Sequence, residues 1–175
     1  VGVHMIHDVM AIQRPGALDD AARGTTAVCL MHMSGEPRTM QHTPIYDNVV
    51  TEVHAFLESR MQACFAAGIE MDRICLDPGF GFGKTLEHNL QLLRSLAAFL
   101  DLKCPLLVGL SRKSMIGKLL GRTAVSQRLY GSISLAGLAV WLGASIVRCH
   151  DVAETHDAVT VIAAVRDSGS GVSFS

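Results

Sequence analysis

The sequence has little of what marks a specialised class of protein. Lysine and arginine number 15 against 16 aspartate and glutamate residues, and no long block carries a single sign of charge. This balance argues against a nucleic-acid partner and against an anionic membrane surface. No apolar run has the length of a membrane span. We therefore expect neither nucleic acid nor membrane among the partners of this chain.

Cysteine is scarce as well and follows no pairing pattern. The five cysteines are odd in number, are scattered along the chain and never form a C-x-x-C pair. This spacing gives no disulfide framework. No cluster of histidine, cysteine and carboxylate residues has metal-ligand spacing either. We expect reduced, partly buried thiols in a cytoplasmic protein.

The remaining composition is that of an ordinary globular domain. The chain has 175 residues, of which 49% are hydrophobic and 18% charged, enough for one domain with a sizeable core. The small polar segment 167–175 is expected to fray, so we assign the domain to 1–166 and a flexible tail to 167–175. The chain begins at Val1, within an apolar run and without an initiator methionine. We expect it to be the N-terminally truncated part of a longer protein.

Five short apolar segments have the composition of buried strands. Most of their positions are β-branched or aliphatic, as expected where both faces of a sheet are covered. The predicted strands are 2–9, 26–33, 73–78, 104–113 and 145–152. Apolar residues spaced three or four apart predict helices over 47–67, 86–100 and 131–143. A last helix is expected to begin at Asp151, where Glu154 would complete a capping box.

Strands that alternate with helices indicate a parallel α/β sheet. Polar or ionisable residues stand at the carboxyl ends of the strands: Asp8, His32, Asp77, Ser111 with Lys113, and Arg148 with His150. A (β/α)8 barrel builds its site from many strand ends, whereas a doubly wound sheet uses one switch point. We therefore predict an α/β fold of the TIM type, an incomplete (β/α)8 barrel to which this chain supplies about five βα units. An open α/β fold is the alternative.

A glycine-rich segment, DPGFGFGKT at 77–85, follows the third predicted strand. It is not a Walker A motif, because Pro78 stands where the first glycine is required, and its glycines do not fit a dinucleotide fingerprint. Alternating glycines let a backbone approach a ligand, and they would leave Phe80 and Phe82 free to pack on it. The alternative is a loop that leads into a helix and packs two aromatic rings.

Further candidate side chains follow three of the strands. Ser111 and Lys113 share one face because side chains alternate along a strand, and a lysine beside a carboxylate suits a planar heterocycle or an anion. The alternative is a solvated lysine at the start of a loop. Arg148 and His150 also share a face, where guanidinium and imidazole would clamp an anion. His32 is expected to be a hydrogen-bonded core residue.

Four motifs together resemble the bacterial type of dihydropteroate synthase. They are LMHM-x-G-x-P-x-T-M at 30–40, LDPGFGFGK at 76–84, GLSRKS-M-I-G at 109–117 and VRCHDV at 147–152. The resemblance runs from Val1 to about Val165 and corresponds to strands four to eight of that family's barrel. It implies a transferase of folate biosynthesis and a sulfonamide target. The implied reaction condenses 6-hydroxymethyl-dihydropterin diphosphate with p-aminobenzoate to give 7,8-dihydropteroate and diphosphate.

The resemblance also implies residues for the two organic substrates. Asp77 matches the carboxylate that hydrogen-bonds the edge of the pterin, and Met31 matches an apolar contact to the pterin. Lys113 matches a lysine that contacts the pterin and forms part of the p-aminobenzoate pocket. Phe82 and Ser114 match residues along that second pocket.

The diphosphate and the cofactor are implied in the same way. Arg148 and His150 match the pair that holds the diphosphate leaving group, and with Lys113 they are the expected catalytic residues. His7 stands where the family has an asparagine that contacts pterin, and it is kept as a substrate-binding candidate. The resemblance implies Mg2+ as cofactor, with no metal ligand in this chain because the family's assisting asparagine belongs to the preceding part. It also implies a homodimer.

Two other interpretations stay open. The first is a catalytically inactive fragment or remnant that retains partial pterin binding, which His7 and the truncation favour. The second is a related pterin-binding methyltransferase domain. The combination of SRKS with RCHDV fits the synthase better than the methyltransferase.

Overall fold

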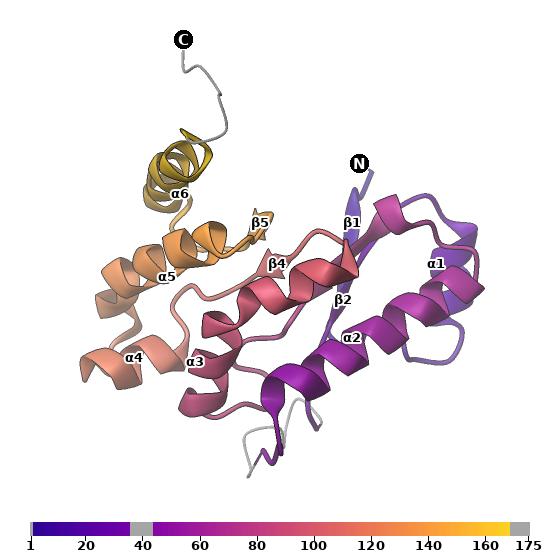
Figure 1. The fold of residues 1–175 in the computed structure, drawn as a ribbon, viewed down its shortest axis with the longest axis horizontal. Helices are drawn as coiled ribbons and strands as arrows, with labels where there is room; N and C mark the ends of the chain where they lie inside the picture. The colour runs from indigo at the N-terminus through magenta and orange to yellow at the C-terminus, as the bar shows by residue number, and fades with distance from the viewer. Residues whose placement is uncertain (1, 36–43, 169–175) are drawn as a thin grey trace.

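The structure is a computed structural model that describes residues 2–35 and 44–168. The strands are β1 (Met5–Asp8), β2 (Ala27–Met31), β3 (Ile74–Asp77), β4 (Leu107–Val108) and β5 (Ile146–Val147). The helices are α1 (Ala17–Arg23), α2 (Val49–Ala66), α3 (Leu86–Arg94), α4 (Ser114–Leu120), α5 (Leu129–Trp141) and α6 (Val152–Asp167). Short 3-10 helices cover Met71–Arg73, Leu96–Leu102 and Val125–Arg128. Figure 1 shows β1 and β2 beside α1 and α2, with α4 and α5 in the orange half and α6 near the end of the chain.

All the strands are parallel and lie beside their neighbours in chain order. One sheet has the order β1-β2-β3, and β4 pairs with β5. A parallel bridge between Leu76 and Leu106 joins the two sheets. This order, with a helix after each strand, confirms the predicted α/β fold as part of a (β/α)8 barrel.

The pairing register separates two faces of these strands. On one face, Val28, Leu30, Ile74 and Leu76 belong to the large core that packs against the helices. On the other face, Met5, Cys29, Cys75 and Leu107 form a second, small cluster. Side chains two residues further along this second face therefore stand at the carboxyl ends of the strands.

Helix α2 illustrates how local sequence and packing cooperate. Asn48 precedes the helix, and its side-chain oxygen accepts hydrogen bonds of 3.1 Å from the backbone nitrogens of Val50 and Thr51. The residues that face the sheet are buried at helical spacing: Val49, Val53, Leu57, Met61 and Cys64. The helix predicted over 47–67 is confirmed with nearly the same ends.

The capping box predicted for the last helix is wrong. Asp151 does precede α6, but its side chain makes no capping hydrogen bond. Arg112 takes that carboxylate instead, with Arg112 Nε donating to Asp151 Oδ2 over 3.1 Å. A charge-assisted pair to a guanidinium competes successfully with a cap, because it forms two bonds at once.

The expectation that both phenylalanines of the glycine-rich loop stay free is also wrong. Phe80 is 1% exposed and belongs to the large core, whereas Phe82 is half-buried. The local pattern cannot distinguish the two rings, because the direction of each is set by what the loop packs on.

Two further observations bear on the predicted boundaries. Asp167 is the last residue of α6, and residues 169–175 of the predicted tail lie outside the described part of the chain. The motif segment 36–40 also falls outside it.

Among residues 2–35 and 44–168, no helix has both the length and the apolar character that a membrane span requires.

Candidate functional site

The candidate side chains gather where the second face of the strands ends. Register places His7 level with Cys29, and Met31 level with Asp77, all on that face. The same alternation in β5, which pairs Ile146 with Leu107, directs Arg148 to the same side. The structure therefore brings residues from four strands to one edge, but for the first two strands the expected strand-end residues are wrong. Asp8 instead accepts hydrogen bonds from the backbone nitrogens of Met10 and Ile12, and His32 is buried.

Asp77 is almost fully buried and is fixed by the backbone. Its Oδ1 accepts a hydrogen bond of 2.7 Å from the nitrogen of Gly79, and the residue is 2% exposed. Its Oδ2 lies 3.1 Å from His7 Nε2. That nitrogen is buried and, within the described residues, makes no hydrogen bond of acceptable geometry. The imidazole of His7 thus stands directly against the second oxygen of the Asp77 carboxylate.

Two glycines of the loop after β3 allow it to lie against the end of β2. Gly79 has φ +72°, and a Cβ there would stand 1.8 Å from the carbonyl oxygen of His32. Gly83 has φ +63°, and a Cβ there would stand 2.3 Å from the carbonyl oxygen of Ser34. Only glycine fits either position. The close approach inferred from the sequence is real, but here its partner is the protein's own backbone.

A buried lysine, Lys84, holds this loop from inside. Its Nζ lies 2.9 Å from His32 Nδ1 and donates to the carbonyl oxygens of Gly79 at 3.0 Å and Phe82 at 3.1 Å. Burial lowers the pKa of Lys84 to about 7, against the opposing effect of Asp77. Burial and the neighbouring Lys84 lower the pKa of His32 to about 3. His32 is thus confirmed as a hydrogen-bonded core residue, and Lys84 is a site-supporting residue that the sequence reading missed.

A second lysine, Lys113, lies on the outer side of the same loop. Its Nζ donates to the carbonyl oxygen of Phe80 and stands 4.4 Å from the ring centroid of Phe82. A Cβ on Gly81 would come within 3.1 Å of Lys113 Cδ, so the glycine makes room for the lysine. The pKa of Lys113 is lowered to about 8, mainly by burial. The charge of Asp77 opposes this shift, and the charge of Arg148 adds to it.

Beside Lys113 opens a pocket of about 440 Å³ between the ends of β4 and β5. Its lining residues are Phe82, Gly109, Ser111, Arg112, Lys113, Val125, Arg148, Cys149 and His150. Arg148 is exposed and crosses Gly109, where a Cβ would come within 2.8 Å of Arg148 Nη2. No described residue forms a hydrogen bond or ion pair with the Arg148 guanidinium. His150 Nδ1 lies 3.0 Å from Ser111 Oγ. Three permanent or near-permanent cations and one imidazole around a single pocket favour an anionic ligand.

Two predicted site residues lie at the margin of this arrangement. Met31 is fully buried, and its Cγ would be 3.4 Å from a Cβ on Gly79, which places it beneath the loop. Ser114 is exposed at the start of α4 and lines a separate small hollow with Lys84 and Lys118.

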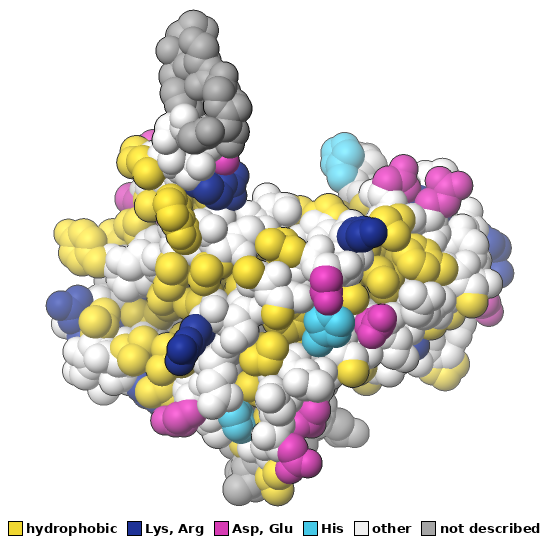
Figure 2. Space-filling model, in the orientation of Figure 1, with side chains coloured by type: hydrophobic (Ala, Val, Ile, Leu, Met, Phe, Trp, Pro, Cys, Tyr) yellow, Lys and Arg dark blue, Asp and Glu magenta, His cyan; other side chains and the backbone are white. Residues whose placement is uncertain are grey.

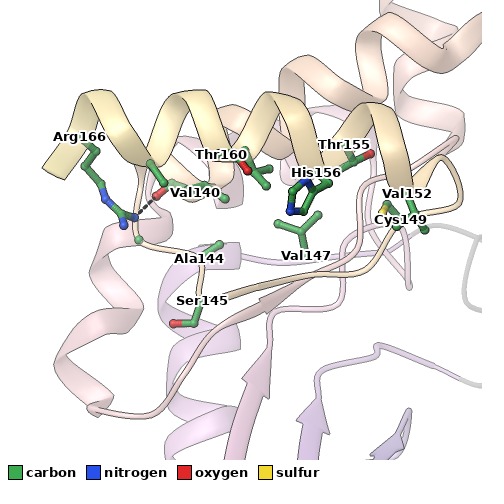
Figure 3. A pocket seen from close by; sticks show the side chains of 13 residues that line it. Val140, Ala144, Ser145, Val147, Cys149, Val152, Thr155, His156, Thr160 and Arg166 are labelled. Carbon is green, nitrogen blue, oxygen red and sulfur yellow. Dashed lines mark hydrogen bonds between the residues drawn. The ribbon is translucent and has the colours of Figure 1, made fainter. Parts of the chain in front are cut away.

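A larger cavity lies elsewhere, between α6 and β5. It measures about 600 Å³ and is lined by apolar residues with Thr155, Thr160, His156 and Arg166 (Figure 3). Arg166 turns back and donates to the carbonyl oxygen of Val140 at 2.8 Å. Among the described residues, this cavity brings together one arginine whose guanidinium is already engaged, whereas the pocket beside Lys113 brings together Arg112, Lys113, Arg148 and His150, so the latter is the candidate site.

The described residues do not form a site for a divalent cation. No group of three or more histidine, cysteine or carboxylate residues among them could hold a metal ion. At the pocket beside Lys113, the carboxylate of Asp151 is engaged by Arg112. Mg2+ prefers several oxygen ligands, and the described residues that line this pocket include no carboxylate.

Comparison with known proteins agrees with this arrangement. A model of the family described as "Pterin binding enzyme" matches residues 1–150. The dihydropteroate synthase of Escherichia coli K12 is 50% identical over 164 residues, which cover 94% of this chain and 58% of that protein. The chain thus spans somewhat more than half the length of this relative.

Solved structures of dihydropteroate synthases share the fold. The Yersinia pestis enzyme with a sulfonamide drug complex has a TM-score of 0.92 and 47% identity, covering 95% of this chain and 61% of that chain. Two structures of the Xanthomonas albilineans enzyme each have a TM-score of 0.86, 47% identity and cover 97% of this chain. One is in complex with 7,8-dihydropteroate and the other with 4-aminobenzoic acid, and the chain covers 62% and 58% of them. From its sequence, its parallel strand order and its strand-end site, the chain belongs to the family of pterin-binding enzymes.

Proposed function

We propose that this chain carries most of the substrate site of a dihydropteroate synthase. The reaction would condense 6-hydroxymethyl-dihydropterin diphosphate with p-aminobenzoate, giving 7,8-dihydropteroate and diphosphate. The observation that carries the proposal is the pocket in which Lys113, Arg148 and His150 surround one space beside the buried Asp77. The similar Xanthomonas albilineans proteins that hold 7,8-dihydropteroate and 4-aminobenzoic acid support it.

The chemistry asks for charge stabilisation and orientation. The C–O bond between the pterin methylene and the diphosphate breaks, and its electron pair leaves with the diphosphate. The amine nitrogen of p-aminobenzoate forms the new C–N bond and then loses one proton to solvent. Arg148 and His150 would stabilise the negative charge that develops on the leaving oxygen, which lowers the barrier because that charge is greatest in the transition state.

The other side chains would orient the two organic substrates. Asp77 would accept hydrogen bonds from donors on the pterin edge, and His7, whose Nε2 lies 3.1 Å from Asp77 Oδ2, would lie beside the pterin. Lys113 and the half-buried ring of Phe82 would bound the aromatic amine. Met31 would support the pterin from below the loop, and Ser114 would lie at the outer edge of the amine pocket.

Several further properties belong to this proposal. Mg2+ would accompany the diphosphate, as the resemblance implies, and no residue described in this chain is proposed as its ligand. The pterin-binding domain would span 1–166, followed by a tail at 167–175. The five free cysteines suit the reducing conditions of the cytoplasm. Exposed apolar side chains on α5 and α6, including Leu138, Trp141 and Val161, suit a homodimer, and hydrophobic side chains gather over these helices in Figure 2.

One observation favours a second candidate, a non-catalytic remnant that retains pterin binding. His7 Nε2 faces the carboxylate that the pterin would use. A histidine at 3.1 Å from this carboxylate would compete with the pterin for it.

Two measurements test the proposal and separate the candidates. Isothermal titration of the chain with a pterin diphosphate analogue should show binding, and loss of binding in Asp77→Asn. Turnover is measured in a chimera that joins this chain to the part of the Escherichia coli relative outside the 164 matched residues. Dihydropteroate formation by the chimera supports the synthase, whereas binding without turnover supports the remnant. Absence of both would contradict the two candidates together.

A further inference from the structure

The pairing of β4 with β5 continues beyond the strands through side chains. The last backbone bond of the ladder is made by Arg148 N, after which the two segments separate. Next along the chain, His150 N donates to Ser111 Oγ at 3.2 Å, and His150 Nδ1 lies 3.0 Å from the same oxygen. One residue further, Arg112 Nε donates to Asp151 Oδ2 at 3.1 Å. Two consecutive side-chain links therefore tie the loop after β4 to the loop after β5.

Arg112 occupies a backbone conformation that is unfavourable for a residue with a Cβ. Its φ is +58°, in the left-handed region. Two contacts hold it there: its nitrogen donates to Ser132 Oγ, and its carbonyl oxygen accepts from Arg128 Nη1, both at 2.9 Å. This backbone turn directs the Arg112 side chain toward Asp151 while Lys113, the next residue, points toward Phe80 and Phe82.

Asp151 also gives up a favourable local interaction. It precedes α6 with Glu154 three residues later, a pattern that favours an N-cap, yet its side chain caps nothing. The carboxylate is 16% exposed and faces Arg112. The Arg112 guanidinium holds the pKa of Asp151 below its usual range. The ion pair therefore joins Asp151, which does not cap its helix, to Arg112, whose backbone conformation is unfavourable.

We infer that Arg112 and Asp151 are positioning residues whose ion pair sets the distance between Lys113 on one loop and Arg148 with His150 on the other. The inference rests on the proposed function, because it assigns the ion pair to the diphosphate pocket. Arg112 is adjacent in the chain to Lys113, and Asp151 is adjacent to His150 and three residues from Arg148. The pair closes the side of the pocket that the β4–β5 backbone ladder leaves open.

A purely electrostatic role and a positioning role of Asp151 predict opposite changes in anion affinity when its carboxylate is removed. Asp151 is a negative charge beside an anion pocket, so its removal would strengthen anion binding if charge were its only role. Removal would also release Arg112, which lines the same pocket, to contact the anion directly. A positioning role predicts weaker anion binding, because the loops after β4 and β5 lose the ion pair that holds Lys113 and Arg148 in place. The sign of the change therefore separates the two roles.

The test is isothermal titration of the full chain with inorganic diphosphate. Asp151→Ser should raise the Kd about tenfold, as loss of a supporting partner commonly does. Its Tm should stay equal or rise, because serine is a good N-cap. Arg112→Lys, which keeps the charge and loses the two-bond geometry, should raise the Kd similarly. The double variant should bind no more weakly than either single variant, since both act through one link. Asp167→Ser, the same replacement at the other end of α6, should leave the Kd unchanged.

The outcomes are distinguishable. Wild-type chain that binds diphosphate, with Asp151→Ser binding equally well or more tightly, would overturn this inference and leave the proposed function intact. Additive losses in the double variant would overturn it as well. Wild-type chain that binds no diphosphate would remove the anion pocket itself, and with it the proposed function.

Discussion

The ammonium of Lys113 stands 4.4 Å above the ring centroid of Phe82, while the ring of the neighbouring Phe80 is buried in the core. A cation at this distance from an aromatic face is attracted by the ring quadrupole. The same loop thus sends one ring to the pocket and the other to the interior. Replacement of Phe82 by alanine should therefore affect substrate binding, whereas replacement of Phe80 should affect the stability of the fold.

Phe82→Ala should leave the free energy of unfolding within about 1 kcal/mol of wild type, because the ring is half-buried. It should raise the KM for p-aminobenzoate in the chimera. Phe80→Ala should lower the free energy of unfolding by about 3–5 kcal/mol through loss of a buried ring. Urea unfolding and steady-state kinetics measure the two effects, and equal destabilisation by both replacements would contradict the assignment.

Two glycines allow a matched test of backbone and site. Gly79→Ala should lower the free energy of unfolding by about 2–4 kcal/mol, because the new methyl group meets the His32 carbonyl and φ is positive. At Gly109, the three atoms nearest to a new methyl group all belong to the flexible end of the Arg148 side chain. Gly109→Ala should unfold nearly as wild type but bind diphosphate more weakly, since Arg148 must move. Calorimetry on both variants measures Tm and Kd together, and a large drop in Tm for Gly109→Ala would be inconsistent with this reading.

The buried pair of Lys84 and His32 predicts how stability depends on pH. The pKa of His32 falls from 6.5 to about 3 and that of Lys84 from 10.5 to about 7, so the unfolded chain binds more protons within both windows. Stability should therefore rise with pH from about 3 to 6.5 and again from about 7 to 10.5. Urea unfolding at a series of pH values measures this.

Lys84→Met provides the control for the upper window. The variant should lose the part of the upper rise that belongs to Lys84, keep the rise between about pH 8 and 10.5 that belongs to Lys113, and keep the rise at lower pH that belongs to His32. It should also be less stable than wild type at pH 9, because the carbonyl oxygens of Gly79 and Phe82 lose their donor. A rise of equal slope in Lys84→Met would show that other groups cause it.

The strands and the longer helices were predictable because each carries its own hydrophobic pattern. The five strands lie within the predicted segments, and α2 appears close to its predicted bounds. The predicted lengths of the last two strands are wrong, because β4 and β5 have two residues each and the residues after them form loops. The helix predicted over 86–100 ends at Arg94 and is followed by a 3-10 helix. Helices α1 and α4 were not predicted, since each has seven residues and few turns over which periodicity can show. Short helices are formed here by packing more than by propensity.

Local sequence is enough to propose the candidate site residues but not their contacts. Asp77 ends β3, and Lys113, Arg148 and His150 follow β4 and β5, an order along the chain that local sequence reveals. The partner of Lys84 lies 52 residues away in the chain. The partner of Asp151 lies 39 residues away and overrides a capping signal that is locally complete. Contacts of this kind depend on the tertiary fold, so no local pattern contains them.

The central claim is that the Arg148 pocket receives the diphosphate leaving group, and Arg148→Ala in the chimera tests it most directly. The guanidinium is exposed and has no partner among the described residues, so its loss should change the free energy of unfolding by less than about 0.5 kcal/mol. The rate of dihydropteroate formation should fall by a factor of about 100 or more, because a group that stabilises developing negative charge is removed. When Tm and turnover of Arg148→Ala are measured together, the predicted result is an unchanged Tm with turnover lost. A lowered Tm with full turnover would contradict the account.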